Sequence, residues 1–344
     1  MSRFESGGGL LAADEFTWRD GERTIVFKED ALAEVVESLR WHGWDRYELL
    51  TTSRALNDAP LQLPGHAAAV HDVPHGAVNE LAAALLDEVD SPALVALGGG
   101  RVIDTAKAIA AVRGGRVTAL PTTLSGAEMT AIHKLPDGHS APHLVRPQLV
   151  FAQPSAMTGL DEQPLRASAM NALAHGADSL YTPLANPVSE LAALRGAKLV
   201  ATALDGGLDP DGKADLALGS ILCAYAIDSA KFSLHHVICQ SLVRVMRIPH
   251  ADTNAAILPR ALEALIPRAG TQMTALARAL GTKRAGLAER VEELSGGRRT
   301  LSALGADRAK LELALDTILG RDELEMTPDP PDRDELRELI EAAW

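Results

Sequence analysis

Five residues between positions 171 and 250 have types and spacings that suit metal binding or proton transfer. Asn171 and His175 are four residues apart, as are His236 and Gln240, and His250 follows soon after. Residues four apart lie on one face of a helix. Neutral imidazole is a common ligand of transition metals, and histidine also exchanges protons near neutral pH. The spacing predicts a metal centre or histidine acid–base chemistry, whereas one buried histidine alone is usually only a hydrogen-bonded core residue.

His235 precedes His236 directly, but it points about 100° away from it around a helix. We therefore expect the two rings to have different surroundings. His235 is retained as a second candidate for proton transfer.

The other chemical feature is three consecutive glycines, Gly98, Gly99 and Gly100. They follow an apolar run at residues 92–97, typical of a buried strand, and precede a helix that opens near Val102. Glycine lets the backbone approach a ligand, and the N-terminus of a helix favours an anion such as phosphate. The spacing is not GxGxxG, so a tight turn without a ligand remains an alternative.

The elements around the glycines alternate between strand and helix patterns. A hairpin is expected at residues 16–27 around Asp20-Gly21, and strands at residues 47–52, within 61–73 and at 117–120. Helical spacing covers residues 31–41 and 77–89. This alternation predicts an α/β domain with a doubly wound parallel sheet, a Rossmann-like architecture.

In such a sheet, the end of the second strand commonly meets the adenosine ribose of a dinucleotide. The expected strand end, Thr51 to Ser53, contains no carboxylate that would repel a 2′-phosphate. Thr51 and Ser53 are therefore candidate contacts for either NAD or NADP, unless these hydroxyls merely cap the next turn.

After residue 153 the strand patterns nearly vanish. Long Ala- and Leu-rich helical stretches run at about residues 163–181, 187–205, 213–230, 232–246 and 253–265. We predict two domains, an α/β nucleotide domain at residues 1–153 and an all-helical domain at residues 154–344 that holds the substrate and faces the glycine turn.

Composition excludes several classes of partner. The chain has 344 residues and a formal net charge of −13, so nucleic acid and anionic membranes are unlikely partners, and an anionic substrate needs a local cationic cradle. No signal-like leader and no long uncharged apolar run is present in the sequence. We expect a cytoplasmic protein.

Together these segments resemble the iron-containing (group III) alcohol dehydrogenase superfamily, and within it the maleylacetate reductases. The resemblance covers nearly the whole chain through FTWRDGERTIVF, VPHGAVNELA, ALVALGGGRVIDTAKAIA, ALPTTLSGAEMT, NALAHGADSLY, HHVICQ, IPHADTNAAILP and TPDPPDRDELRELIEAAW. The glycines with Asp104, Lys107 and PTT mark the superfamily, and AEMT with the Pro-rich tail marks the reductase branch.

The resemblance implies residues for NADH or NADPH. The glycines would hold the pyrophosphate, Thr122 and Thr123 would line the ribose and nicotinamide, and Ser125 would lie nearby. Asp104 is a cofactor residue of the family, or only a favourable acid in the first helical turn. Arg101, in place of a small serine, would contact phosphate or point to solvent.

The superfamily's metal ligands, one Asp and three His, map onto Asn171, His175, His236 and His250. Asn171 is a poorer ligand than a carboxylate, so iron or zinc would bind less tightly, and Asn171 becomes a candidate substrate contact. Gln240 replaces a histidine near the reacting centre and cannot titrate. Arg244, one turn beyond Gln240, is either a partner for a substrate carboxylate or a solvated arginine.

The resemblance implies hydride transfer from NAD(P)H to a small carbonyl or enone acid, as in reduction of maleylacetate to 3-oxoadipate. His236, His235, His250 and Gln240 are the catalytic candidates. Two alternatives stay open: a reductase of the superfamily redirected to another aldehyde or ketone, and a nucleotide-binding homologue without redox activity. A homodimer through the N-terminal hairpin is also implied.

Overall fold

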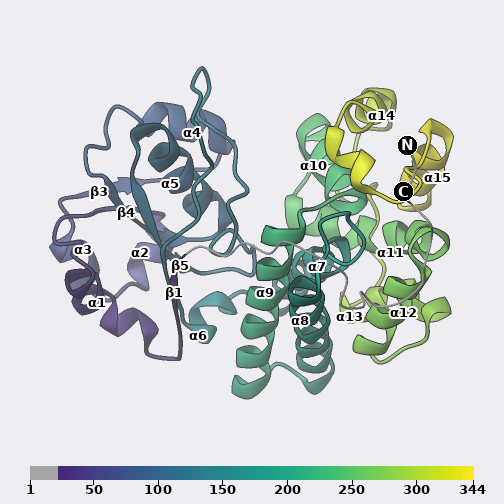
Figure 1. Ribbon diagram of the computed structural model, residues 1–344, viewed down its shortest axis with the longest axis horizontal. Helices are drawn as coiled ribbons and strands as arrows, with labels where there is room; N and C mark the ends of the chain where they lie inside the picture. The colour runs from purple at the N-terminus through teal and green to yellow at the C-terminus, as the bar shows by residue number, and fades with distance from the viewer. Residues whose placement is uncertain (1–21) are drawn as a thin grey trace. The chain divides into compact units, whose positions relative to one another are not determined.

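The structure is a computed structural model that describes residues 22–344, and these form two compact units, residues 22–160 and 161–344 (Figure 1). The domain boundary predicted from the sequence, at residues 153/154, lies just before helix α6 (Pro154–Met157). The first strand of the predicted hairpin and its Asp20-Gly21 turn lie outside the described residues.

The first unit is built on a six-stranded sheet in the order β1-β6-β5-β4-β2-β3. Its strands are β1 (Thr24–Phe27), β2 (Glu48–Thr51), β3 (Ala69–Asp72), β4 (Ala93–Gly98), β5 (Arg116–Pro121) and β6 (Leu149–Ala152). Every neighbouring pair runs parallel. The predicted α/β fold is therefore confirmed.

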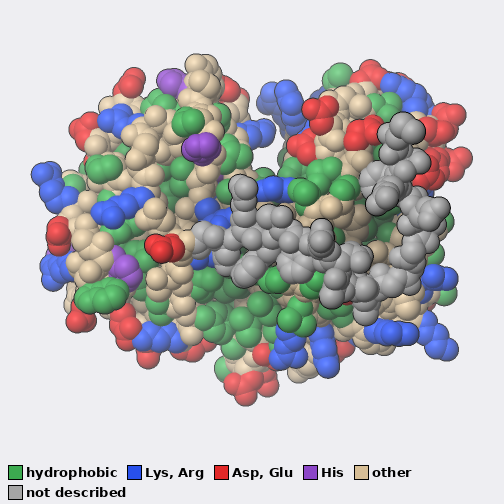
Figure 2. Space-filling view, viewed as in Figure 1, with side chains coloured by type: hydrophobic (Ala, Val, Ile, Leu, Met, Phe, Trp, Pro, Cys, Tyr) green, Lys and Arg blue, Asp and Glu red, His purple; other side chains and the backbone are tan. Residues whose placement is uncertain are grey.

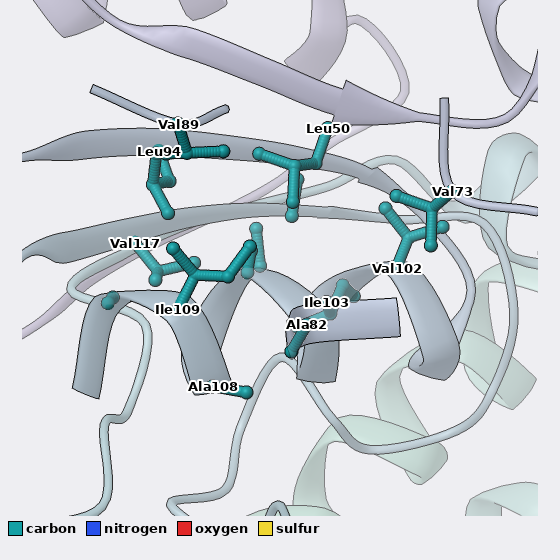
Figure 3. Close-up of a cluster of buried hydrophobic side chains, with 14 of the residues drawn as sticks. Leu50, Val73, Ala82, Val89, Leu94, Val102, Ile103, Ala108, Ile109 and Val117 are labelled. Carbon is teal, nitrogen blue, oxygen red and sulfur yellow. The ribbon is translucent and has the colours of Figure 1, made fainter. Parts of the chain in front are cut away.

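Helices cover both faces of this sheet, because strands buried on both faces require apolar layers on each side. They are η1 (Ala31–Glu34), α1 (Val35–Trp41), α2 (Ser53–Asn57), α3 (Gln62–His66), α4 (Val78–Leu85) and α5 (Gly100–Arg113). One core joins the strands to α4 and α5, where Ile109 packs beside Leu94 and Val117 (Figure 3). The other core joins the strands to η1, α1 and α3.

The register of the sheet aligns the carboxyl ends of three strands. β4 lies between β2 and β5, with Thr51 opposite Leu97 and Gly98 opposite Pro121. Ligands of open parallel sheets bind outside the carboxyl ends of the strands. The loops after β2, β4 and β5 are thus the part of this unit where a ligand is expected.

The second unit is helical in all its regular elements, as predicted. Its long helices are α7 (Glu162–Asp178), α8 (Pro187–Gly206), α9 (Pro210–Ala230), α10 (Leu234–Met246) and α11 (His250–Arg268). The remaining elements are α12 (Gly270–Ala279), η2 (Arg284–Gly286), α13 (Leu287–Leu294), η3 (Arg308–Lys310), α14 (Leu311–Leu319), η4 (Asp322–Met326) and α15 (Arg333–Ala342).

Glycines let α7, α8 and α9 approach one another closely around Cys223. A Cβ on Gly196 would lie 2.7 Å from the Cys223 Sγ, and one on Gly219 would lie 2.9 Å from the Gly196 carbonyl oxygen. A Cβ on Gly176 of α7 would lie 3.1 Å from the same sulfur. This close packing fixes α7, which carries Asn171 and His175.

Acidic and basic side chains are interspersed around the periphery of the described surface drawn in Figure 2. No helix among residues 22–344 is long and apolar enough to cross a membrane.

Candidate functional site

The turn after β4 requires glycine for conformational and steric reasons. Gly98 has a φ of +158°, and a Cβ there would lie 2.7 Å from the Val102 Cγ2. Its carbonyl oxygen accepts a 3.0 Å hydrogen bond from the backbone N–H of Thr122. The turn after β4 is therefore joined directly to the loop after β5.

The next two glycines pack against that same loop. A Cβ on Gly99 would lie 3.1 Å from the Thr123 Oγ1, and one on Gly100 would lie 2.9 Å from the Ser125 Cβ. Gly100 is the first residue of α5, so the free N–H groups at the N-terminus of this helix lie beside the same loop. The structure thus gathers the glycines and the predicted Thr122, Thr123 and Ser125 into one cradle at the start of α5.

Asp104 lies beyond the first turn of α5, so its interpretation as an acid of the first helical turn is wrong. Its carboxylate binds the Lys107 Nζ at 2.7 Å. Lys107 is fully buried and also donates to the carbonyl oxygens of Ala127 and Ile132, each at 3.0 Å. Lys107 therefore fastens α5 to the loop after β5. Arg101 lies with its Nη1 3.2 Å from the His75 Nδ1.

The hydroxyls after β2 differ in their surroundings. Thr51 is buried, and Ser53 is exposed at the start of α2. The Oγ1 of Thr52 caps α2 by accepting a 3.2 Å hydrogen bond from the Ala55 N–H. Of these positions, Ser53 is the one whose side chain solvent reaches most freely.

Glu128 is a buried acid that the sequence analysis did not single out. It is fully buried, and neither carboxylate oxygen has a hydrogen-bond partner within residues 22–344. Burial raises its pKa to about 7, although Lys107 lowers it. The glutamate of the AEMT segment was visible in the sequence, but its burial was not.

In the helical unit, the structure brings the predicted His175 and His236 together. Their rings stack with centroids 4.9 Å apart and planes 14° apart. Desolvation, and then the neighbouring His236 and His250, lower the pKa of His175 well below its usual value. The pair is buried, with relative exposures of 8% and 3%.

Asp178 holds His236 in place. Its Oδ2 accepts hydrogen bonds from the His236 Nδ1 at 2.8 Å and from the backbone N–H groups of His236 and Ser233, each at 3.2 Å. Its Oδ1 accepts from the Tyr181 hydroxyl. Although burial alone would raise it, the hydrogen bond and charge interaction with His236 lower the pKa of Asp178 to about 2.

An ionised Asp178 assigns the proton of this contact to the Nδ1 of His236. The Nε2 of His236 is buried and has no hydrogen-bond partner in the described chain. It is the ring atom left for a substrate. Asp178 was missed from the sequence, although its position three residues after His175 on one helix was an available signal.

His235 points elsewhere, as the 100° rotation predicted. Its Nε2 lies 2.8 Å from the Asn254 Oδ1 on α11, and its ring meets His236 edge-on at 5.0 Å. Desolvation, then His236, lowers the pKa of His235 to about 3. This fully buried ring joins α10 to α11.

The predicted metal ligands do not assemble into a metal centre. No group of three His, Cys, Asp or Glu side chains within residues 22–344 is arranged to hold a metal ion. Asn171 is buried one turn before His175, and it supplies an amide where a carboxylate would add charge. His250 is the first residue of α11 and is exposed. Three imidazoles hold Zn²⁺ only where they converge on one point, and the described residues show no such convergence.

Gln240 is already engaged within the protein. Its Oε1 accepts a 3.0 Å hydrogen bond from the Nη1 of Arg321, a residue that no sequence pattern indicated. Arg244, one turn beyond Gln240, is exposed, and no hydrogen bond or ion pair joins it to the described residues.

Comparisons with known proteins match both units. The family model "Iron-containing alcohol dehydrogenase" matches residues 22–146, and "Fe-containing alcohol dehydrogenase family, C-terminal" matches residues 166–344. Maleylacetate reductase of Burkholderia cepacia is 36% identical over 262 residues, which cover 73% of each chain. Maleylacetate reductase 1 of Rhodococcus opacus is 29% identical, covering 96% of this chain and 97% of its own.

Solved structures agree with these relatives. The crystal structure of maleylacetate reductase from Rhizobium sp. strain MTP-10005 superposes with a TM-score of 0.85 at 25% identity, covering 96% of this chain and 98% of the other. The similarity thus extends over both units.

Proposed function

Because the chain belongs to the iron-containing alcohol dehydrogenase family, we propose that it is an NAD(P)H-dependent reductase whose substrate is maleylacetate. The chain is an NAD(P)-dependent oxidoreductase similar to the maleylacetate reductases. The observation that carries the proposal is the His236 imidazole held by Asp178, in a chain that matches such reductases along nearly its whole length. Reduction of maleylacetate to 3-oxoadipate adds a hydride to one carbon of the double bond and a proton to the other.

The first unit supports the binding of the dinucleotide. Gly98, Gly99 and Gly100 would hold the pyrophosphate at the start of α5, where a Cβ on Gly99 or Gly100 would press on the loop after β5. Thr122, Thr123 and Ser125 would contact the ribose and nicotinamide side. When bound, NAD(P)H supplies the hydride.

His236 supplies the proton in this proposal. Asp178 holds the proton on Nδ1 and stabilises the imidazolium, so that Nε2 donates its proton to the reduced substrate and is reprotonated from solvent. His175, stacked on the same ring, keeps that ring in one orientation. His235 positions α10 through Asn254.

We derive no step through a metal ion, because the described structure does not bring His175, His236 and His250 around one point. Stabilisation of the developing enolate falls to the imidazolium of His236.

We propose that the enzyme accepts both NADH and NADPH as cofactors. Residues 51–53, after β2, carry hydroxyl groups and no carboxylate that would repel the 2′-phosphate of NADPH. A homodimer remains a prediction, and light scattering in solution tests it.

The test is oxidation of NADH and of NADPH with fresh maleylacetate, followed at the nicotinamide absorbance band. Turnover with formation of 3-oxoadipate supports the proposal. Cofactor binding with turnover of other aldehydes or ketones, but not of maleylacetate, assigns the chain to a redirected reductase, for which the glutamine at position 240 is the favouring observation. Cofactor binding without turnover of any carbonyl substrate overturns an enzymatic role.

A further inference from the structure

Arg321 lies beside the proposed proton donor in the fold of the helical unit. It immediately precedes η4, and its guanidinium reaches α10, where the Nη1 donates to the Gln240 Oε1 at 3.0 Å. Gln240 follows His236 by four residues, so both side chains lie on one face of α10. Arg321 is thereby connected to the helix face that carries His236.

An aromatic ring completes this connection. The Arg321 guanidinium carbon lies 5.8 Å from the centroid of the Phe232 ring. The Phe232 ring in turn lies 5.8 Å from the His236 ring. One cation and one proton-carrying imidazole therefore flank a single aromatic side chain.

The guanidinium is held in a fixed orientation. Its Nε and Nη2 donate to the two oxygens of Glu323 at 3.0 Å and 2.9 Å. The same hydrogen bonds lower the pKa of Glu323, so this carboxylate stays ionised. The side chain of Arg321 is only 24% exposed. An arginine held on one edge by Glu323 and at Nη1 by Gln240 is preorganised for a further ligand.

Two N–H groups of the Arg321 guanidinium are left for a ligand. A guanidinium has five N–H groups, and the contacts above use three of them. One N–H on Nη1 and one on Nη2 have no acceptor within residues 22–344. Paired N–H groups of this kind bind carboxylates with two parallel hydrogen bonds.

We propose that Arg321 binds one carboxylate of the dicarboxylate substrate, with Glu323 and Gln240 as the residues that position it. This inference rests on the proposed function for the identity of the substrate. It also explains the position of Gln240, since a titrating histidine there would share the Arg321 contact only in its neutral form, whereas glutamine accepts the hydrogen bond at every pH.

The test measures binding rather than turnover. Calorimetry with the NAD⁺-saturated enzyme compares 3-oxoadipate, which has two carboxylates, with 4-oxopentanoate and 3-oxohexanoate, each of which keeps a different one. Arg321→Gln should weaken binding of 3-oxoadipate at least about tenfold, and binding of only one monocarboxylate by a similar factor. Arg321→Lys should restore part of the affinity, because it keeps the charge without the fork.

Arg337→Gln is the matched control, because it removes the same charge from an exposed ion pair with Glu312 between α15 and α14. It should leave all three affinities unchanged. If Arg321→Gln weakens binding of all three acids equally, Arg321 only supports the fold. Affinities that are unchanged in Arg321→Gln would also overturn the inference. So would a wild-type protein that does not bind the dicarboxylate more tightly than the monocarboxylates.

The two proposals fail separately. Absence of maleylacetate turnover, with the Arg321-dependent preference for 3-oxoadipate intact, would overturn the proposed function alone. Normal maleylacetate turnover together with an Arg321→Gln variant that binds all three acids like the wild type would overturn the Arg321 inference alone.

Discussion

Asp178 accepts a 2.8 Å hydrogen bond from the Nδ1 of His236, across 58 residues of sequence and between two helices. The carboxylate is fully buried, and its pKa is held near 2 by the hydrogen bond and charge of His236, against the opposing effect of burial. The pair therefore fixes the Nδ1 of His236 in a structural contact and leaves its Nε2 for the substrate.

Asp178→Asn should slow turnover while cofactor binding remains. An amide cannot stabilise the imidazolium of His236 as a carboxylate does, so kcat should fall by about 100-fold or more. NADH binding and the melting temperature are measured on the same sample, with Asp211→Asn in the first turn of α9 as the control. A kcat within about twofold of wild type would contradict the role of Asp178.

The two adjacent histidines should respond differently to substitution by glutamine. His236→Gln should abolish turnover with little loss of NADH binding. His235→Gln should instead cost stability, about 1–3 kcal/mol, because the ring is fully buried and bonded to Asn254. Turnover and denaturant midpoints of both variants separate these effects. Equal activity loss, at equal stability, would assign both rings to catalysis.

Gly100→Ala should weaken NADH binding by about tenfold or more, because its Cβ would lie 2.9 Å from Ser125 in the predicted phosphate cradle. Gly65→Ala is the control, since a Cβ there meets no atom within 4 Å. Fluorescence titration with NADH measures both. If Gly100→Ala binds NADH like wild type, the glycine turn is only a tight connection.

Removal of metal should leave turnover unchanged, because the described structure does not bring His175, His236 and His250 around one point. The enzyme is dialysed against a chelator, analysed for residual metal and assayed before and after addition of Zn²⁺ or Fe²⁺. Asn171→Asp is the informative variant, because a carboxylate there should raise Zn²⁺ affinity. Loss of turnover on dialysis, restored by a metal, would show that the ligands assemble in solution.

Glu128 should make stability depend on pH. Burial raises its folded-state pKa from 4.5 to about 7, so the folded protein binds this proton more tightly than the unfolded chain does. The contribution is fully present below the unfolded value and is lost as pH rises through about 7, an effect of about 3 kcal/mol.

Glu128→Gln removes the titration while keeping the shape of the side chain. Its unfolding free energy should therefore fall less than that of wild type between about pH 5 and about pH 8. Denaturant unfolding across this range measures the difference. Parallel pH profiles for the two proteins would show that Glu128 does not titrate between those limits.

The strand–turn–helix unit around the glycines was readable from residue order. A short apolar run, three glycines and a helical repeat are local signals, and β4, α5 and β5 lie close to the predicted limits. The long helices α7 to α10 were equally visible, because their periodicity extends over several turns. The division between a parallel α/β part and a helical part follows from these same signals.

The contacts that define the chemistry were not local. Spacing indicated that His235 and His236 face different directions. It did not show that His236 is hydrogen-bonded to Asp178 and His235 to Asn254. The ion pair of Asp104 with Lys107 and the burial of Glu128 likewise depend on how the loop after β5 folds over α5.

The chain's order of residues thus determined its family, its two kinds of architecture and its candidate histidines, since all of these are carried by motifs and periodicity. The folded chain decided which candidates are held by a carboxylate, which are structural, and that Arg321 reaches Gln240 across 81 residues. The physical reason is that hydrogen bonding, desolvation and charge depend on distances in space, and neighbours in space are set by helix packing rather than by separation along the chain.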